Sequence, residues 1–147
     1  MKGHKGERME KKLGVAGIIP RGGTVLVLRR AHTDGFLPGA YDLPGGGLEP
    51  GESPEDGIRR EVLEETGLRT SVVRRLGERN YLPGSGAEDK TLIVYLLRPV
   101  GDNFRITLSE EHDEYRWVED SDLEKVFGQG DLMGSVIHEY FMSTSSR

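Results

Sequence analysis

The feature that most constrains this chain is a glycine-rich stretch, residues 46–52, that leads into a strongly acidic helical segment. At about 100° per residue, Glu61, Glu64 and Glu65 fall within an arc of roughly 100° on that helix. Such crowding costs a helix about 0.2–0.5 kcal/mol per like-charged pair unless a positive charge lies among them. A hard divalent cation such as Mg²⁺ prefers carboxylate oxygens and bridges to substrate phosphates. The pattern therefore predicts a metal site on this helix face, because the repulsion among the glutamates would be relieved by a bound cation.

The acidic helix carries its own start and stop signals. Ser53 is expected to cap it, Pro54 suits the first helical position, and Gly67 suits the left-handed residue that ends it. The face opposite the glutamates is expected to pack against the core through Ile58, Val62, Leu63 and Thr66. The helix is thus predicted to have one buried face that anchors it and one acidic face that performs chemistry.

Apolar runs predict the strands. Residues 13–19 and 24–30 are rich in β-formers, and residues 20–23 between them are typical of a turn. Residues 25–28 and 91–97 are apolar on both faces, so these strands should be central and covered on each side. Weaker strand patterns occupy residues 68–81, 104–108 and 114–118.

Two further helices are expected near the end of the chain. Ser121 is predicted to cap a helix over residues 121–127, and Asp131 one over residues 131–142. Strands covered on both faces, with helices before and after them, imply an α/β protein: an α/β/α sandwich with a central mixed β-sheet.

Composition limits the class of protein. A chain of 147 residues is most simply one domain, here residues 13–142, with a loose polar arm over residues 1–12 and a polar tail over 143–147. Met9 is an alternative start. A net charge of −5 argues against a general duplex-binding protein, and the lack of cysteine excludes disulfides and thiolate metal sites. Neither a membrane span nor a signal peptide is apparent, so a cytoplasmic location is expected. The sequence does not fix the oligomeric state, and a homodimer is compatible with it.

The glycine loop and the helix together resemble a complete Nudix box, the signature of Nudix (MutT-like) hydrolases. Gly46, five residues, Glu52, seven residues, and then Arg60 to Leu68 (Arg-Glu-Val-Leu-Glu-Glu-Thr-Gly-Leu) fill every fixed position of that pattern. Residues 41–45 and 116–118 look like flanking segments of the same family. One departure is Gly57, where the family would lead us to expect alanine. Either this is drift at a tolerant position, the reading we favour, or it makes room for a phosphate or a metal.

The resemblance implies a Nudix fold, a nucleotide substrate and a set of roles. Nudix enzymes cleave a nucleoside diphosphate linked to another group by means of a metal-bound water. Glu61, Glu64 and Glu65 would hold Mg²⁺ or Mn²⁺, and the neighbourhood of Gly46 would add a backbone carbonyl. Glu61 could instead act as the general base. Glu52 either joins the metal shell through water or pairs with Arg60 and orients the cluster, and we favour the pairing.

Outside this pattern the predictions are weaker. A loop glutamate serves as base or extra ligand in several family members, and here Glu111 is favoured over Glu110 and Glu114. His112 is expected to be a surface residue and Trp117 to pack in the core.

The residues proposed to contact substrate come from other segments. Arg29 and Arg30 end a central strand, and one of them could bind a phosphate. Tyr41 and Phe36 could stack on a base or simply pack. Pro83 lies where members that cleave ADP-ribose often carry a proline, although an ordinary turn explains it equally.

The favoured hypothesis is a metal-dependent pyrophosphohydrolase acting on a (deoxy)nucleoside triphosphate, including oxidised ones, or on an ADP-sugar such as ADP-ribose. The alternative is a Nudix-fold module that senses a nucleotide without turnover. The presence of Glu61, Glu64 and Glu65 favours the enzyme, and Glu64→Gln or Glu65→Gln is expected to cost orders of magnitude in turnover. A third hypothesis, a partner-binding acidic helix, does not explain Glu52 or the glycine loop.

Overall fold

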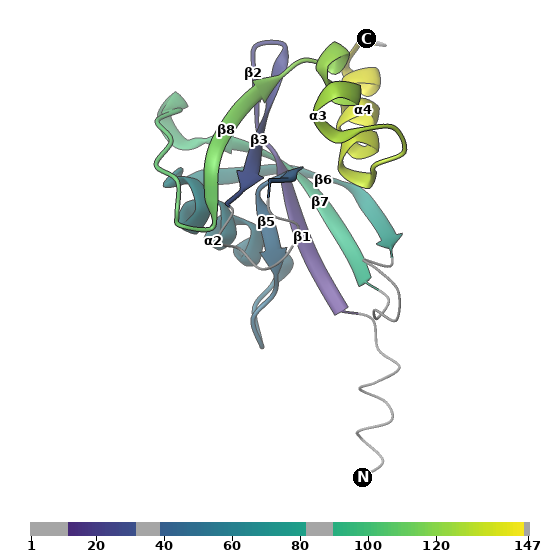
Figure 1. Ribbon diagram of the computed structural model, residues 1–147. Coiled ribbons are helices and arrows are strands. Elements are labelled where there is room, and N and C mark those ends of the chain that lie inside the picture. Colours follow the sequence, from purple (N-terminus) through teal and green to yellow (C-terminus); the bar gives the residue numbers. More distant parts are fainter. Residues whose placement is uncertain (1–11, 32–38, 82–89, 146–147) are drawn as a thin grey trace.

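The computed structural model describes residues 12–31, 39–81 and 90–145, arranged as strands and helices in the order seen in Figure 1. The strands are β1 (Lys12–Ile18), β2 (Pro20–Arg21), β3 (Thr24–Arg30), β4 (Tyr41–Asp42), β5 (Gly45–Gly47), β6 (Thr70–Tyr81), β7 (Lys90–Pro99) and β8 (His112–Val118). The helices are α2 (Pro54–Thr66), α3 (Leu123–Phe127) and α4 (Leu132–Ser145), with short 3₁₀ turns η1 (Val100–Asp102) and η2 (Asp120–Asp122). Phe36 and Pro83 lie outside the described residues.

The strands form two sheets. In the first, the order is β5-β1-β7-β6, with β1 and β7 parallel and the other pairs antiparallel, so this sheet is mixed as predicted. In the second, β3 is central and pairs antiparallel with β2, β4 and β8. The two long strands predicted to be central, β3 and β7, are each flanked by partners on both edges.

Helices cover both faces of this arrangement, which confirms the α/β/α sandwich (Figure 1). Val25 and Val27 pack in one core cluster with Val136 and Ile137 of α4. Leu26 and Leu28, on the other face of the same strand, pack in a second cluster with α2. All four positions of residues 25–28 are fully buried, as the continuous apolar run predicted.

Helix α2 begins and ends as its sequence predicts. Ser53 accepts a hydrogen bond from the Asp56 N–H, and Gly67 ends the helix in the left-handed conformation. Two side chains differ from the expected faces. Leu63 is 40% exposed, whereas Glu65 is buried at 5% exposure. Glu65 lies three residues after the buried Val62, so it belongs to the helix face that packs on the sheet. Leu63 lies outside that face and is exposed to solvent.

This difference gives a stability prediction within one helix. Ile58→Ala is expected to cost about 2–5 kcal/mol, because the side chain is completely buried and its loss leaves a cavity. Leu63→Ala should stay within about 0.5 kcal/mol of the wild type, since its side chain is largely in water. Urea midpoints of the two variants measure the difference, and equal losses would show that the assignment of faces is wrong.

Three predicted boundaries or elements are corrected. Residues 104–108 are not a strand: the Thr107 and Ser109 N–H groups instead bond the Thr66 and Glu65 carbonyls at the end of α2, which satisfies free helix acceptors. The helix predicted over residues 121–127 starts at Leu123, because Ser121 lies inside η2. A reciprocal capping box between Glu119 and Asp122 begins η2. Helix α4 continues to Ser145, past the predicted end at residue 142.

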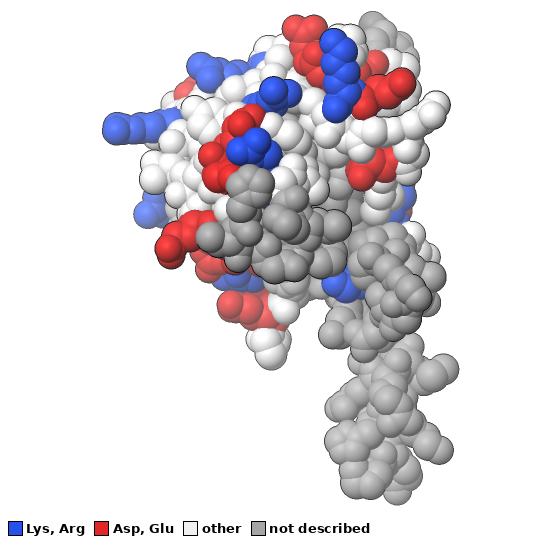
Figure 2. All heavy atoms as spheres, viewed as in Figure 1, with Lys and Arg blue, Asp and Glu red and all other residues white. Residues whose placement is uncertain are grey.

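Other features of the described chain agree with the sequence. Asp131 caps α4, accepting hydrogen bonds from the N–H groups of Met133 and Gly134. Within the described ranges, no helix is long and apolar enough to cross a membrane. Figure 2 shows acidic and basic side chains interspersed over the coloured part of one face.

Candidate active site

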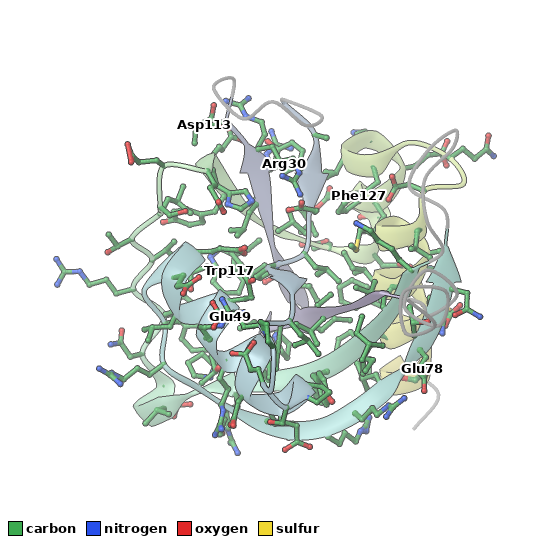
Figure 3. All side chains as sticks on the ribbon, turned by 90° about the horizontal axis from the view of Figure 1, so that it is seen from below. Arg30, Glu49, Glu78, Asp113, Trp117 and Phe127 are labelled. Carbon is green, nitrogen blue, oxygen red and sulfur yellow. The ribbon has the colours of Figure 1, made fainter. Side chains whose placement is uncertain are left out.

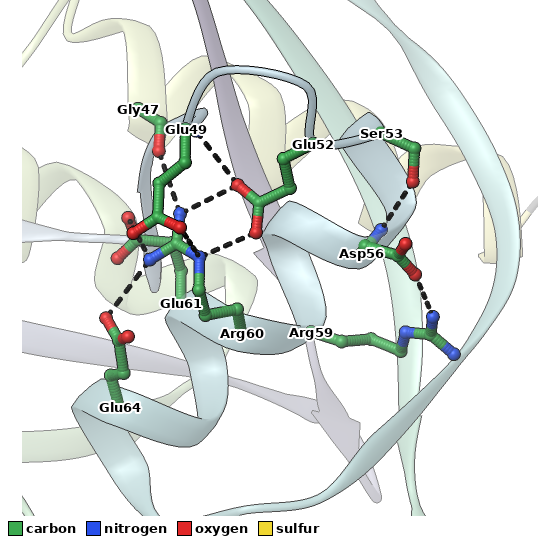
Figure 4. Close-up of polar contacts among 9 residues, drawn as sticks. All are labelled: Gly47, Glu49, Glu52, Ser53, Asp56, Arg59, Arg60, Glu61 and Glu64. Atoms are coloured by element: carbon green, nitrogen blue, oxygen red, sulfur yellow. Dashed lines mark hydrogen bonds and ion pairs between the residues drawn. The ribbon is translucent and has the colours of Figure 1, made fainter.

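Arg60 is the centre of a polar network between the glycine loop and α2 (Figure 4). Its guanidinium binds Glu52 through two hydrogen bonds, Nε to Oε2 at 2.7 Å and Nη2 to Oε1 at 3.0 Å. The same Nη2 donates to the Gly47 carbonyl at 3.1 Å, and Glu52 accepts the Glu49 N–H. The predicted pairing of Glu52 with Arg60 is present. It ties the loop to the first turns of the helix, because the fork geometry of arginine matches a carboxylate.

The Arg60 guanidinium holds the pKa of Glu52 at about 2, well below its ordinary value of 4.5, with a smaller contribution from the Glu49 N–H. A carboxyl whose pKa is lower in the folded than in the unfolded state stabilises the protein at any pH above its unfolded-state pKa. This stabilisation is lost as the pH falls from the unfolded-state pKa to the folded-state pKa. Glu52→Gln should therefore be less stable than the wild type at neutral pH, and the difference should shrink between about pH 4.5 and pH 2. Urea midpoints over this range measure it, and a difference that does not change with pH would contradict the ion pair.

Glu61, which is partly buried, and Glu65, which is buried, form an acidic pair beside the glycine loop. Glu65 accepts a hydrogen bond from the Gly45 N–H at 3.0 Å. Burial raises the pKa of both carboxyls above the ordinary value, and for Glu65 the neighbouring Glu61 raises it further. Gly46 leaves room for the pair, because a Cβ at that position would lie 2.5 Å from Glu61 Oε2 and 2.9 Å from Oε1. Two carboxylates crowded against main chain in this way are a site that a cation would stabilise.

Glu64 is the most exposed of the three glutamates. Its side chain is 58% exposed, and its carboxylate lies 3.2 Å from Arg60 Nη1 (Figure 4). Arg60 Nη1 also lies 3.4 Å from Glu61 Oε2, so the guanidinium stands between the two glutamates. Accordingly, in the part of the chain that the structure describes, no three acidic or histidine side chains gather closely enough to hold a metal. The structure brings Gly46, Glu61 and Glu65 together, whereas Glu64 is linked to Glu61 only through Arg60.

Gly57 has a different explanation from the two considered above. It is buried, and a Cβ there would collide with the end of the Leu48 side chain and lie 3.2 Å from Glu52 Oε1. The missing methyl group therefore makes room for the glycine loop to pack on α2, and the space is filled by protein.

A cleft of about 1040 Å³ opens beside the glycine loop. One wall comes from β1, β4 and β5, and the other from the start of β7 and of α4. Its apolar lining includes Leu43, Leu92, Leu132 and Met133, and its polar lining includes Arg30, Asp42, Glu49, Glu52, Lys90 and Asp131. A largely apolar cleft with a few convergent charges, beside carboxyls whose pKa values are raised, is the usual form of a small-molecule site.

Arg30 and Arg29 have different surroundings. Arg30 lines the cleft and lies at the end of the second sheet (Figure 3), with its Nε 3.2 Å from Asp42 Oδ2. Arg29 is held by Asp113, Nε to Oδ1 at 2.8 Å, and by Glu114 at 3.5 Å. Of the two arginines predicted to contact substrate, only Arg30 lines the cleft, because both acidic partners of Arg29 belong to β8.

Asp42 and His112 lie between Arg30 and the acidic pair, and sequence reasoning missed Asp42. His112 is buried, not on the surface as predicted, because its backbone pairs with Arg30 at a bulge in β8, where Asp113 is the extra residue. Its Nε2 lies 3.6 Å from Asp42 Oδ1, and the charge of Asp42 contributes to the raised pKa of Glu65. The signal for Asp42 was its place directly before the glycine loop, where a carboxylate is unusual for a half-buried strand.

The loop glutamates occupy separate places. Glu111 is exposed on the turn before β8, and its side chain makes no hydrogen bond or ion pair with any other described residue. Glu110 is exposed beside it. Glu114 accepts a hydrogen bond from the Tyr41 hydroxyl, which lowers the pKa of the carboxyl. Trp117 packs against the second core cluster as predicted, edge-on to Phe104 at 5.7 Å (Figure 3).

The model of the NUDIX domain family matches residues 11–137. The chain belongs to the Nudix family. It is therefore a hydrolase acting on phosphoric anhydrides, as the glycine loop and acidic helix predicted. Nudix hydrolases act on small nucleotide substrates and generally need a divalent metal.

Individual relatives agree with this assignment. The chain is 31% identical over 123 residues to the nucleoside triphosphatase NudI of Escherichia fergusonii, covering 78% of this chain and 86% of that protein. The NudI protein of Escherichia coli O1:K1 is 32% identical over 122 residues, with the same coverage. Among solved structures, the MutT protein of Methanosarcina mazei Go1 superposes with a TM-score of 0.73 and 28% identity, over 95% of this chain and 99% of that one.

Proposed function

We propose that this Nudix hydrolase is a Mg²⁺- or Mn²⁺-dependent pyrophosphohydrolase of nucleoside triphosphates. The observation that carries the proposal is the Glu61–Glu65 pair against Gly45 and Gly46, beside a cleft large enough for a nucleotide. Triphosphates are preferred to ADP-sugars because the NudI relatives, similar over most of the chain, are nucleoside triphosphatases. An ADP-ribose pyrophosphatase of Streptococcus suis shares 20% identity with a TM-score of 0.70, and this likeness supports the fold alone.

The residues fit a hard divalent cation. The donors are all oxygens, and Mg²⁺ is usually held by one or two carboxylates together with substrate phosphates. Glu61, Glu65 and a backbone carbonyl near Gly46 would supply the protein's share, and the exposed Glu64 would join them. A bound cation would neutralise phosphate charge and generate a nucleophilic hydroxide from water.

The remaining residues have supporting roles. Arg60, fixed by Glu52, would hold the helix and the loop in register and offset the mutual repulsion of Glu61 and Glu64. Arg30 would bind a phosphate in the cleft, since its guanidinium matches phosphate geometry. Glu61 and Glu111 both remain candidates for the general base. The partly buried position of Glu61, next to Glu65, favours it over Glu111 on an exposed turn.

Product release over a nucleotide panel tests this function. Phosphate and pyrophosphate would be measured with Mg²⁺ on canonical and oxidised dNTPs, ADP-ribose, other nucleotide sugars and dinucleoside polyphosphates. Metal-dependent release of pyrophosphate from one or more triphosphates is the expected result. Turnover of ADP-ribose instead would overturn the substrate class, and nucleotide binding without turnover of any compound would favour a sensor.

A further inference from the structure

A row of side chains across three strands fixes the ring of Tyr41. Tyr41 on β4 lies opposite Arg29 on β3, and Arg29 lies opposite Glu114 on β8, so all three share one face of the sheet. The Tyr41 hydroxyl donates a hydrogen bond to Glu114. Arg29 and Arg116 hold the same carboxylate at 3.5 Å and 3.3 Å. The hydroxyl end of the ring is therefore anchored to a carboxylate that two arginines keep in place.

Arg116 also contacts the ring itself. Its Cζ lies 5.5 Å from the centroid of the Tyr41 ring, in the arrangement of a cation over an aromatic face. The ring is half-buried and packs against the core cluster on the α4 side, yet it still lines the cleft. There it stands beside the apolar side chains of Leu43, Leu92, Leu132 and Met133 and near Arg30.

A ring fixed in this way suits a flat ligand. Every nucleobase has a π-face that stacks on an aromatic side chain, and a purine offers the larger face. Because the hydroxyl and the guanidinium already restrict the ring, little side-chain entropy remains to be lost on binding. The base and the phosphates would use different parts of the site, since the acidic pair and Arg30 would bind the phosphates.

We propose that Tyr41 is the platform on which the nucleobase stacks, and that it gives the enzyme a preference for purines. This inference rests on the proposed nucleotide substrate. Glu114, through the Tyr41 hydroxyl, is a positioning residue for the ring. Arg29 is thereby assigned to the support of Tyr41 through Glu114.

Binding of dGMP and dCMP, measured by calorimetry, tests the proposal without requiring turnover. The variants are Tyr41→Leu, Tyr41→Phe and, as a matched control, Tyr115→Leu, an exposed tyrosine on the other face of β8. Tyr41→Leu should weaken dGMP binding by at least about tenfold and remove the preference over dCMP. Tyr41→Phe keeps the ring but frees it from Glu114, so it should weaken dGMP binding by only about threefold and retain the preference. Tyr115→Leu should bind as the wild type does.

The outcomes separate the two proposals. Equal dGMP affinity in wild type and Tyr41→Leu would overturn the stacking role. So would the loss of the preference for dGMP over dCMP in Tyr41→Phe, a result that can be read even if the leucine variant folds poorly. Purine-selective binding that depends on Tyr41, in a protein that cleaves no triphosphate, would support the platform while refuting the proposed function.

Discussion

Glu65→Gln is expected to lower kcat for the nucleotide substrate by at least about 100-fold, because metal stabilisation of phosphate charge contributes several kcal/mol. The same change should leave the metal-free protein as stable as the wild type or more so at neutral pH. Burial raises the pKa of Glu65, so the folded state is penalised for the ionised carboxyl, and glutamine removes that penalty. The amide oxygen can still accept the Gly45 N–H. Activity and stability should thus move in opposite directions.

Kinetics and thermal unfolding of the purified variants measure both effects. Glu55→Gln is the matched control, because it removes an exposed glutamate from the first turn of the same helix. It should keep the activity of the wild type. A folded Glu65→Gln variant with near-normal kcat would refute the metal-ligand assignment. A large fall in Tm in the absence of metal would show that Glu65 is held by a structural partner.

Gly46→Ala is expected to reduce kcat by about 10–100-fold, since displacing a reacting or ligand group by about an ångström can cost that much. An added methyl would lie within 3 Å of the Glu61 carboxylate oxygens, so the carboxylate must move. The backbone at Gly46 is not in the left-handed region, and the substitution should therefore fold normally.

Gly47→Ala is the comparison for this prediction. The neighbouring glycine belongs to the same strand and lines the same cleft, but a Cβ there meets no atom within 4 Å. Its kcat should change much less than that of Gly46→Ala. Equal effects of the two alanines would mean that the loop needs glycine for flexibility or backbone reach, and the close contact between Gly46 and Glu61 would lose its importance.

Much of the fold could be predicted because its signals are local. Ser53 and Gly67 mark the ends of α2 through their own conformational preferences, and the buried run over residues 25–28 needs only apolar side chains. The spacing of the Nudix box likewise places Glu61 and Arg60 on one helix without reference to other segments.

The remaining features depend on tertiary contacts. Residues 104–108 alternate like a strand, yet the Thr107 N–H bonds the Thr66 carbonyl at the end of α2, and only the folded chain brings those groups together. The burial of His112 follows from the bulge in β8 that pairs it with Arg30, which periodicity does not predict. Glu65 faces the loop while Glu64 turns to Arg60, a choice that depends on where the sheet lies.

Direct measurement of Mn²⁺ binding by electron paramagnetic resonance tests the central claim that Glu61 and Glu65 form the metal site. The titration would use wild type, Glu61→Gln, Glu65→Gln and Glu55→Gln without nucleotide and again with a non-hydrolysable triphosphate. The wild type and Glu55→Gln should bind Mn²⁺ alike, and each of the other two should bind at least about tenfold more weakly, because a ligand carboxylate is lost. Unchanged Mn²⁺ affinity in both Glu61→Gln and Glu65→Gln would place the metal elsewhere and contradict the account.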